Sequence, residues 1–301
     1  MIVSIVIPVL NAAPHLPRLL ARLRSQQPCM PDEIILVDSG STDDTATMAA
    51  ATPGVRFLPL NEKFTHGGSR NRGAAAACGD IVVLMTQDAL PANDDWLANM
   101  LAPLANPQVG AVYARQIPRP GTNPMEMFFL EHRFPAGATP VIRRKPAGPL
   151  TMEDTFFSNV GAAVRRDLLA QFPYNETLIM SEDQQFAKTI LAAGWAIAYQ
   201  PSAPVIHSHN YSLTGTFRRY FDSVYAFRQI FPDHTFGSSS SVGVSYIRRE
   251  YAYMLRHAPL WLPYYCLYNT AKALATLAAH HTRRLPRRLV RLMSLNRAFW
   301  S

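Results

Sequence analysis

The chain has 301 residues, of which 48% are hydrophobic and 17% are charged, enough for one large domain with an appendage or for two domains. Its three cysteines, Cys29, Cys78 and Cys266, lie far apart and form neither a disulfide framework nor a metal pattern, which excludes a disulfide-rich secreted class. We therefore expect a reducing compartment. The opening MIVSIVIPVLN has no basic leader before its apolar run, so we expect a first strand here and not a signal peptide.

The formal net charge of +8 is unevenly distributed along the chain. Acidic and basic residues balance up to Glu250, and no acidic residue follows it. The basic residues after that point are Arg256, Lys272, Arg283, Arg284, Arg287, Arg288, Arg291 and Arg297. A basic segment with interleaved aromatic residues indicates an anionic partner surface, either a membrane or a nucleic acid.

The first ninety residues alternate between short apolar runs and helical patterns. The predicted strands are residues 3–9, 33–37, 55–59 and 81–85, and the predicted helices are residues 14–25, a segment from Thr45, and the alanine-rich residues 74–78. This alternation predicts an α/β fold with a mostly parallel sheet flanked by helices.

Two polar loops follow strands of this sheet. Residues 38–44, DSGSTDD, offer backbone N–H groups and a helix start that suit a nucleotide; the alternative is a capped turn without a ligand. Residues 66–73, HGGSRNRG, contain Gly67 and Gly68, which permit a close approach of the backbone. Arg70 and Arg72 fall on opposite helix faces, so only one of them faces a given ligand. Neither loop has the spacing of a GxxxxGK[ST] or GxGxxG motif, which argues against nucleotide hydrolases and dehydrogenases.

The run Ile81 to Met85 ends in Thr86-Gln87-Asp88, which places a carboxylate at the carboxyl end of a buried strand. An oxygen ligand there suits a divalent cation and, through it, a diphosphate. The alternative is that Asp88 only caps the helix expected around residues 94–104.

The second half of the chain predicts strands at residues 111–116, 159–165 and 195–199. We expect residues 117–150, rich in proline and glycine, to form a long loop beside the site, where the basic triplet 143–145 is alternatively a solvated face. Ser181 and Gln184 fit a capping box that opens a helix running to about Ala193. Acidic residues in that first turn, Glu182 and Asp183, are commonly dipole partners alone.

Together these motifs resemble the inverting family-2 glycosyltransferases of the GT-A fold over roughly residues 1–230. The resemblance rests on VSIVIPVLN at 3–11, ILVDSGSTDDT at 35–45, TQDA at 86–89 and SEDQQFAKTILAAGW at 181–195. The HGGSRNRG segment, TQDA in place of an acid-x-acid triplet, and RRYFDSVYAFR at 218–228 are similar to bacterial rhamnosyltransferases.

The resemblance implies a role for each matching residue. Asp183 would be the general base, Glu182 would orient the acceptor, and Asp88 would bind a divalent cation, Mg²⁺ or Mn²⁺, with His207 or His209; we favour His207. The nucleotide-sugar donor would be bound by Pro8, Asn11, Asp38, Ser39, Ser41, Gly67, Gly68, Arg70 and Gln87. Thr86 replaces the first acid of the usual triplet, so a single carboxylate supports the cation.

The function that follows is inverting transfer of a sugar, most specifically L-rhamnose from dTDP-rhamnose, to a hydroxyl of a lipid-linked surface-polysaccharide acceptor such as O-antigen. The alternatives are the same fold with another UDP-, GDP- or dTDP-sugar, and a non-catalytic protein that binds a membrane or nucleic acid through the basic tail. We expect no nucleic-acid partner, because no such module is recognisable. No G-x-S-x-G hydrolase motif is present either.

We expect residues 1–215 to be the catalytic domain and residues 216–301 to be a helical basic extension. In that extension, Leu285, Leu289, Leu292 and Met293 share one stripe, and Trp261, Tyr264, Tyr265 and Tyr268 suit a membrane interface. Residues 259–279 contain two prolines, Asn269 and Lys272, which argues against a membrane span. The expectation is a cytoplasmic enzyme, peripheral at the inner face of the cell membrane; the alternative is a basic cap on the catalytic domain.

Overall fold

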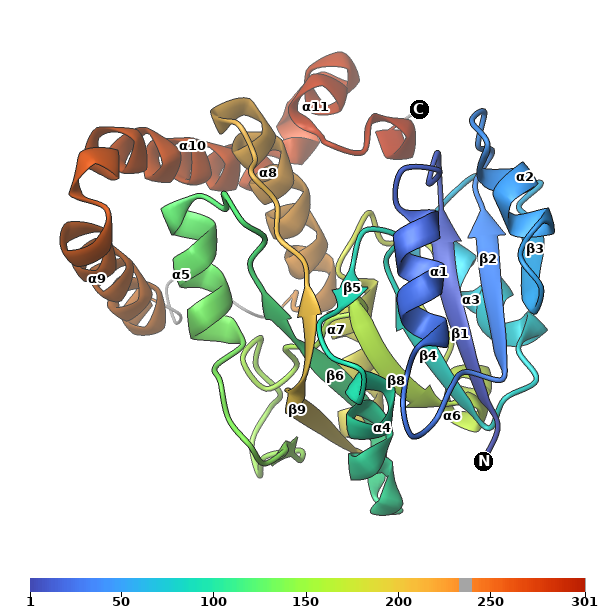
Figure 1. Cartoon of the computed structure of the whole chain (residues 1–301). Coiled ribbons are helices and arrows are strands. Elements are labelled where there is room, and N and C mark those ends of the chain that lie inside the picture. Colours follow the sequence, from blue (N-terminus) through green and yellow to red (C-terminus); the bar gives the residue numbers. More distant parts are fainter. Residues whose placement is uncertain (233–239, 301) are drawn as a thin grey trace. The chain divides into compact units, whose positions relative to one another are not determined.

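The computed structural model of the chain describes residues 1–232 and 240–300. These residues form two compact units (Figure 1), each described by itself below. The first unit comprises residues 1–119, 134–177 and 182–207, and the second comprises residues 120–133, 178–181 and 208–301. Residues 233–239 and 301, which belong to the predicted extension, lie outside the described residues.

The first unit is built on one mixed sheet, which has nine strands among the described residues. They are β1 (Val3–Val9), β2 (Glu33–Asp38), β3 (Val55–Pro59), β4 (Ile81–Met85), β5 (Leu90–Pro91), β6 (Val109–Ile117), β7 (Val141–Arg143), β8 (Gly161–Arg165) and β9 (Ala196–Ile206). Their order is β3-β2-β1-β4-β8-β6-β9-β5, and β7 pairs with β9. Strands β3, β2, β1 and β4 are mutually parallel, as are β6 and β9. Strand β8 runs antiparallel between β4 and β6, so the sheet is mostly parallel but mixed.

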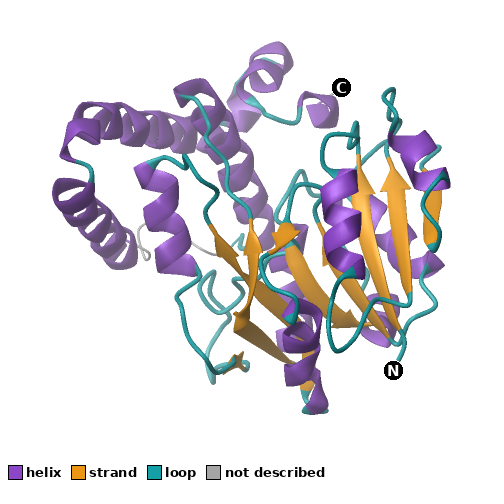
Figure 2. Ribbon diagram, viewed as in Figure 1, coloured by secondary structure: helices purple, strands orange, loops and turns teal. Residues whose placement is uncertain are grey.

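Helices cover both faces of this sheet (Figure 2). They are α1 (Leu16–Arg24), α2 (Thr45–Ala50), α3 (His66–Ala76), α4 (Trp96–Leu101), the 3₁₀ helix η1 (Ala102–Ala105), α6 (Arg166–Gln171) and α7 (Glu182–Ala192). Side chains alternate along β1: Ile5 and Ile7 belong to the core formed with α1 and α4, while Val6 faces α3. A Cβ at Gly73 of α3 would lie 2.2 Å from Val6, so this helix requires glycine to pack on the strand.

The second unit is helical. It contains α5 (Pro124–Arg133), α8 (Leu213–Ile230), α9 (Ser240–His257), η2 (Pro259–Trp261), α10 (Leu262–His280), η3 (Thr282–Arg284), α11 (Arg287–Met293) and η4 (Arg297–Trp300). Helices α8 and α10 pack together through Phe221 and Ala275, and α5 packs on α9 through Met125 and Met254. Within residues 1–232 and 240–300, no helix combines the length and the apolar character needed to cross a bilayer.

Three expectations about local structure were wrong. Residues 117–150 are not a continuous loop, because they contain helix α5 and strand β7. Helix α3 begins at His66, not near Ala74, because the Thr65 side chain accepts a hydrogen bond from the Gly68 N–H and caps the helix there. Ser181 has φ +61°, whereas a capping-box serine has an extended backbone, so α7 does not begin with that motif.

Candidate active site

The predicted site residues of the first unit gather at one edge of the sheet. The carboxyl ends of β1, β2, β4, β6 and β9 and the amino end of β8 share this edge, because β8 is antiparallel to both of its neighbours. Asn11, Asp88 and His207 closely follow β1, β4 and β9, Asp38 is the last residue of β2, and Asn159 precedes β8. This edge is where open α/β sheets bind ligands.

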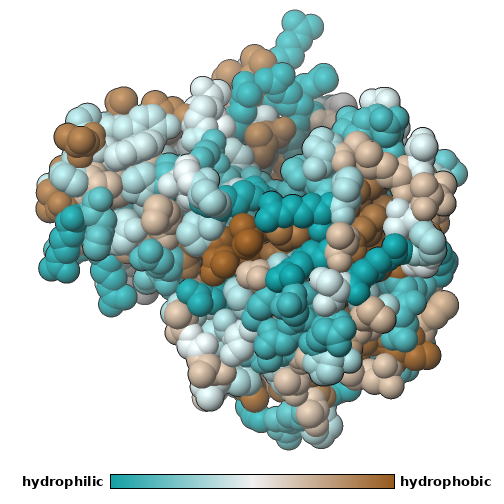
Figure 3. Space-filling model, viewed as in Figure 1, coloured by the Kyte–Doolittle hydropathy of each residue, from teal (hydrophilic) through white to brown (hydrophobic). Residues whose placement is uncertain are grey.

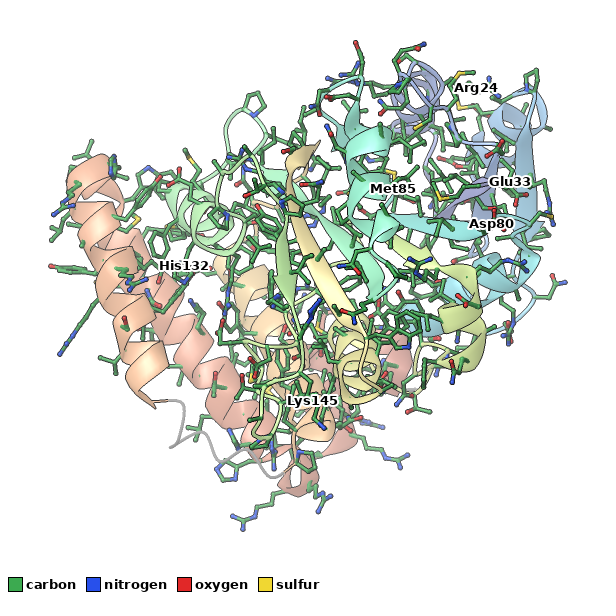
Figure 4. All side chains as sticks on the ribbon, turned by 90° about the horizontal axis from the view of Figure 1, so that it is seen from below. Arg24, Glu33, Asp80, Met85, His132 and Lys145 are labelled. Atoms are coloured by element: carbon green, nitrogen blue, oxygen red, sulfur yellow. The ribbon has the colours of Figure 1, made fainter. Side chains whose placement is uncertain are left out.

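The opposite edge, at the amino ends of the strands, is also polar, but its Glu33 and Asp80 carboxylates accept hydrogen bonds from within the protein. Figure 4 labels Glu33 and Asp80 there, and Met85 toward the other end of β4. The Glu33 carboxylate accepts hydrogen bonds from the Ser4 hydroxyl at 2.5 Å and the Cys78 N–H at 2.6 Å, and Asp80 accepts from the Ile2 N–H at 2.9 Å. These carboxylates hold the main chain.

The loops after β1 and β2 are interlocked by hydrogen bonds. The Asn11 N–H donates to Ser41 Oγ at 2.8 Å, and Asn11 Oδ1 accepts from the Thr42 N–H at 2.8 Å. Asp38 Oδ2 accepts from the N–H groups of Gly40 and Ser41, both at 3.0 Å, and the Ser41 hydroxyl donates to Asp38 Oδ1. The two loops therefore form one preorganised surface.

Gln87 ties the loop after β1 to the loop after β4. The Leu10 N–H donates to Gln87 Oε1 at 2.8 Å, and Gln87 Nε2 donates to the Leu10 carbonyl at 3.1 Å. The Gln87 amide is thus used within the protein, and its predicted donor contact stays a prediction.

Asp88 does not cap the helix that follows it. The N-cap residue of α4 is Asp95, so the alternative role that the sequence left open for Asp88 is wrong.

Asp88 and His207 form the centre of the candidate cation site. His207 Nε2 lies 3.6 Å from Asp88 Oδ2. His207 Nδ1 lies 2.9 Å from Gln116 Oε1, and Gln116 Nε2 donates to Ser158 Oγ at 3.0 Å. An amide oxygen only accepts, so His207 Nδ1 carries the proton and the lone pair lies on Nε2, toward Asp88. This tautomer suits a metal ligand.

Arg119, which follows β6, also contacts Asp88. Its Nη2 donates to the Asp88 carbonyl and lies 3.4 Å from Asp88 Oδ2. Neither Arg119 nor Gln116 was predicted as a site residue. The rule that ligands bind at the carboxyl ends of strands would have found Gln116, because residues 111–116 were predicted as a strand.

His209, the other predicted cation ligand, belongs to the second unit. The centroid of its imidazole ring lies 5.2 Å from that of the Tyr211 ring, and its backbone N–H donates to Glu126 Oε1 at 3.4 Å. Of the two histidines, His207 is therefore the one that the first unit itself brings to Asp88.

Asp183, in the first turn of α7, is a half-buried carboxylate held in a defined orientation. Its Oδ1 accepts from the Gln184 N–H at 2.8 Å, and its Oδ2 accepts from the Asn159 N–H at 3.4 Å. Burial and the neighbouring Glu182 carboxylate raise the pKa of Asp183 to about 7, although Arg70 acts in the opposite direction. A carboxylate with such a pKa is suited to accept a proton near neutral pH.

Glu182 and Arg70 pair with each other in the interior. Glu182 Oε1 lies 3.0 Å from Arg70 Nη1, and the two side chains are 7% and 6% exposed. Burial alone would raise the pKa of Glu182, but Arg70, His66 and hydrogen bonds to the carboxylate together hold that pKa below the ordinary value. Their predicted contacts with acceptor and donor stay predictions. In the structure, the two residues form a buried ion pair next to Asp183.

The two glycines at the start of α3 have packing roles. A Cβ at Gly67 would lie 2.7 Å from the carbonyl oxygen of Asn175, and one at Gly68 would lie 2.7 Å from Thr65 Oγ1. The close backbone approach that these glycines permit is therefore made within the protein.

Comparisons with known proteins agree with this arrangement. Residues 4–172 match the family described as glycosyl transferase family 2. The chain is 32% identical over 306 residues to the O-antigen chain rhamnosyltransferase RfbN of Salmonella typhimurium, covering 99% of this chain and 96% of that protein. It is 33% identical over 282 residues to the O-antigen chain rhamnosyltransferase WbaN of Salmonella anatum, covering 92% and 88%.

A solved structure shares the fold. The mannosyltransferase PcManGT from Pyrobaculum calidifontis, solved in complex with GDP-Man and Mn²⁺, superposes with a TM-score of 0.58 at 21% identity, covering 99% of this chain and 84% of that chain. At this identity the similarity concerns the fold, and it confirms the expected GT-A architecture.

Proposed function

This chain belongs to glycosyl transferase family 2, and we propose that it transfers L-rhamnose from dTDP-rhamnose to a hydroxyl of a lipid-linked O-antigen acceptor. The assignment of the sugar and of the acceptor class rests on the similarity to two O-antigen chain rhamnosyltransferases. This similarity extends over most of this chain and most of each relative. The site residues are compatible with a single displacement with inversion, because Asp183 would serve as the base and the mechanism needs no protein nucleophile.

In this proposal Asp183 is the general base. The acceptor oxygen forms a bond to the anomeric carbon, the bond from that carbon to the diphosphate oxygen breaks, and the electron pair leaves with the diphosphate. The acceptor proton passes to the Asp183 carboxylate. The two backbone N–H groups that hold Asp183 keep its carboxylate in place, and its raised pKa matches proton transfer near pH 7.

The donor would lie along the edge formed by the loops after β1 and β2. Asp38, Asn11 and Ser41 provide the surface for the nucleoside, next to Pro8 at the end of β1. Within the described residues, the buried Ser39 hydroxyl has no hydrogen-bond partner. A buried polar atom left in this way supports a polar ligand at this edge.

A divalent cation, Mg²⁺ or Mn²⁺, would be held by Asp88 and His207, with His209 as a further candidate two residues along the chain. The residues fit such an ion, because a carboxylate and a correctly protonated imidazole lie 3.6 Å apart. When bound, the cation would stabilise the negative charge of the leaving diphosphate. Thr86 takes the place of a second acid, and its buried hydroxyl is unpartnered within the part of the chain that the structure describes.

The proposed acceptor implies where the enzyme would act. A lipid-linked acceptor and a nucleotide-sugar donor meet at the cytoplasmic face of the cell membrane, so we place the chain there as a peripheral protein. Residues 1–215 would contain the catalytic site, and the extension of residues 216–301, which has an excess of basic residues, would contact the anionic lipid surface.

The direct test is a panel of nucleotide sugars, each assayed for binding and for hydrolysis by the purified protein with and without Mg²⁺ or Mn²⁺. The proposal predicts that dTDP-rhamnose is preferred and that EDTA weakens its turnover. Preference for a UDP- or GDP-sugar would keep the family and discard rhamnose. Binding of none of these sugars would contradict the proposed activity.

A further inference from the structure

Helix α9 presents a stripe of apolar side chains to solvent. Val244, Ile247, Tyr251 and Leu255 are spaced three or four residues apart, which places them on one side of the helix. Each is between 47% and 50% exposed. Large apolar side chains in a continuous line at this exposure indicate a partner outside the unit.

The stripe is not the face with which α9 packs in its own unit. That face is already used: Glu250 and Met254 are fully buried, Met254 lies in the cluster with Met125 and Tyr265, and the Tyr265 hydroxyl lies 3.2 Å from Glu250 Oε2. Helix α9 therefore has two apolar sides, one inside the unit and one at the surface.

The apolar surface continues into the turn after the helix. Leu260 is 94% exposed and Trp261 is 41% exposed, and both belong to η2, which contacts α9. Figure 3 shows hydrophobic surface over this corner between α9 and α10, at the upper left of the view. A leucine projecting from a turn, with a tryptophan beside it, is typical of segments that enter the interfacial region of a bilayer.

The charges around the stripe have one sign. Arg248, Arg249 and Arg256 are exposed on α9. The helix sequence contains one acidic residue, Glu250, and that residue is fully buried. The outward surface of the helix is thus apolar and cationic, which complements anionic lipid headgroups.

We infer that α9 and η2 form a membrane-binding surface, whose apolar stripe and Leu260 enter the interface of an anionic phospholipid bilayer while the arginines contact the headgroups. This inference rests on the proposed function for its purpose, which is to bring the enzyme to a lipid-linked acceptor. Of the aromatic residues that the sequence suggested for a membrane interface, it retains Trp261 but not Tyr265 or Tyr268. Tyr265 is buried, and Tyr268 packs against the Lys272 ammonium at 4.9 Å.

The test is co-sedimentation of the full-length protein with vesicles of phosphatidylglycerol and phosphatidylethanolamine, compared with vesicles of phosphatidylcholine alone. The double variant Ile247→Glu/Leu260→Glu should lose at least about tenfold in partition coefficient, because two apolar anchors become charged. The matched control is Met30→Glu, a 58% exposed apolar residue of the first unit, which should bind as the wild type does. Replacing the three arginines with glutamine should remove the preference for phosphatidylglycerol.

Equal binding by the wild type and the double variant would overturn the inference, as would equal binding to both kinds of vesicle. A second copy of the chain on this face would appear instead as a dimer in light scattering that Leu260→Glu dissociates, and that result would also overturn it. Donor hydrolysis without vesicles should be unchanged in the double variant. Failure of membrane binding is therefore distinguishable from failure of the proposed activity.

Discussion

The charge pair beside the candidate base gives a prediction that separates two roles for Glu182. In the wild type, the Glu182 carboxylate helps raise the pKa of Asp183, and Arg70 opposes it. Substituting Glu182→Gln removes the first influence and leaves the second, so the pKa of Asp183 should fall. Because a general base acts in its deprotonated form, the acidic limb of the rate profile should move to lower pH.

The magnitude follows from the arrangement. A charge within a few ångströms shifts a carboxyl pKa by about 1–3 units, so we expect the pKa of Asp183 to fall from about 7 by at least one unit in this variant. At pH 6, the wild type should show about a tenth of its plateau kcat/KM, whereas the variant should retain about half or more.

The assay is sugar transfer measured from pH 5 to pH 9, with thermal unfolding recorded in parallel. Leaving a buried arginine unpaired costs about 3–5 kcal/mol, so the double variant Arg70→Met/Glu182→Gln serves as a second probe. It loses both charges, and its acidic limb should return toward that of the wild type. A raised acceptor KM with an unmoved limb would refute this reasoning and support a direct contact between Glu182 and the acceptor.

Two further predictions concern positioning and packing. Gln116→Met should weaken Mn²⁺ binding about 10–100-fold, measured by electron paramagnetic resonance, because His207 loses the hydrogen bond that fixes its tautomer. Unchanged Mn²⁺ affinity would exclude a role for Gln116 in orienting His207. Gly67→Ala should lower the free energy of unfolding by about 1–3 kcal/mol, because its Cβ meets the Asn175 carbonyl, whereas Gly148→Ala, with nothing within 4 Å, should not; equal unfolding midpoints in denaturant would contradict this.

The sheet was predictable because its strands are short apolar runs with polar boundaries. Strands β3 and β4 begin and end where the sequence predicted. Helix α5 was missed because prolines and glycines surround it, although Pro124 at its first position is itself a helix-start signal. The antiparallel direction of β8 was not predicted, because an apolar run does not show the direction in which its strand enters the sheet.

The site was predictable where a motif marks a strand end, as at Asp38 and Asp88. His207 was expected beside Asp88 from the family resemblance, but Gln116, which contacts His207, and Arg119, which contacts Asp88, were not predicted as site residues. Gln116 and His207 are 91 residues apart in the sequence, and no local pattern joins them. The pairing of Arg70 with Glu182 likewise depends on α3 and α7 lying on the same side of the sheet.

The most direct test of the central claim is to compare Asp183→Asn with the wild type, using dTDP-rhamnose as the donor. The account predicts that the variant binds the donor with the affinity of the wild type and loses at least about a hundredfold in turnover. Near-normal turnover in this variant would contradict the assignment of Asp183 as the base.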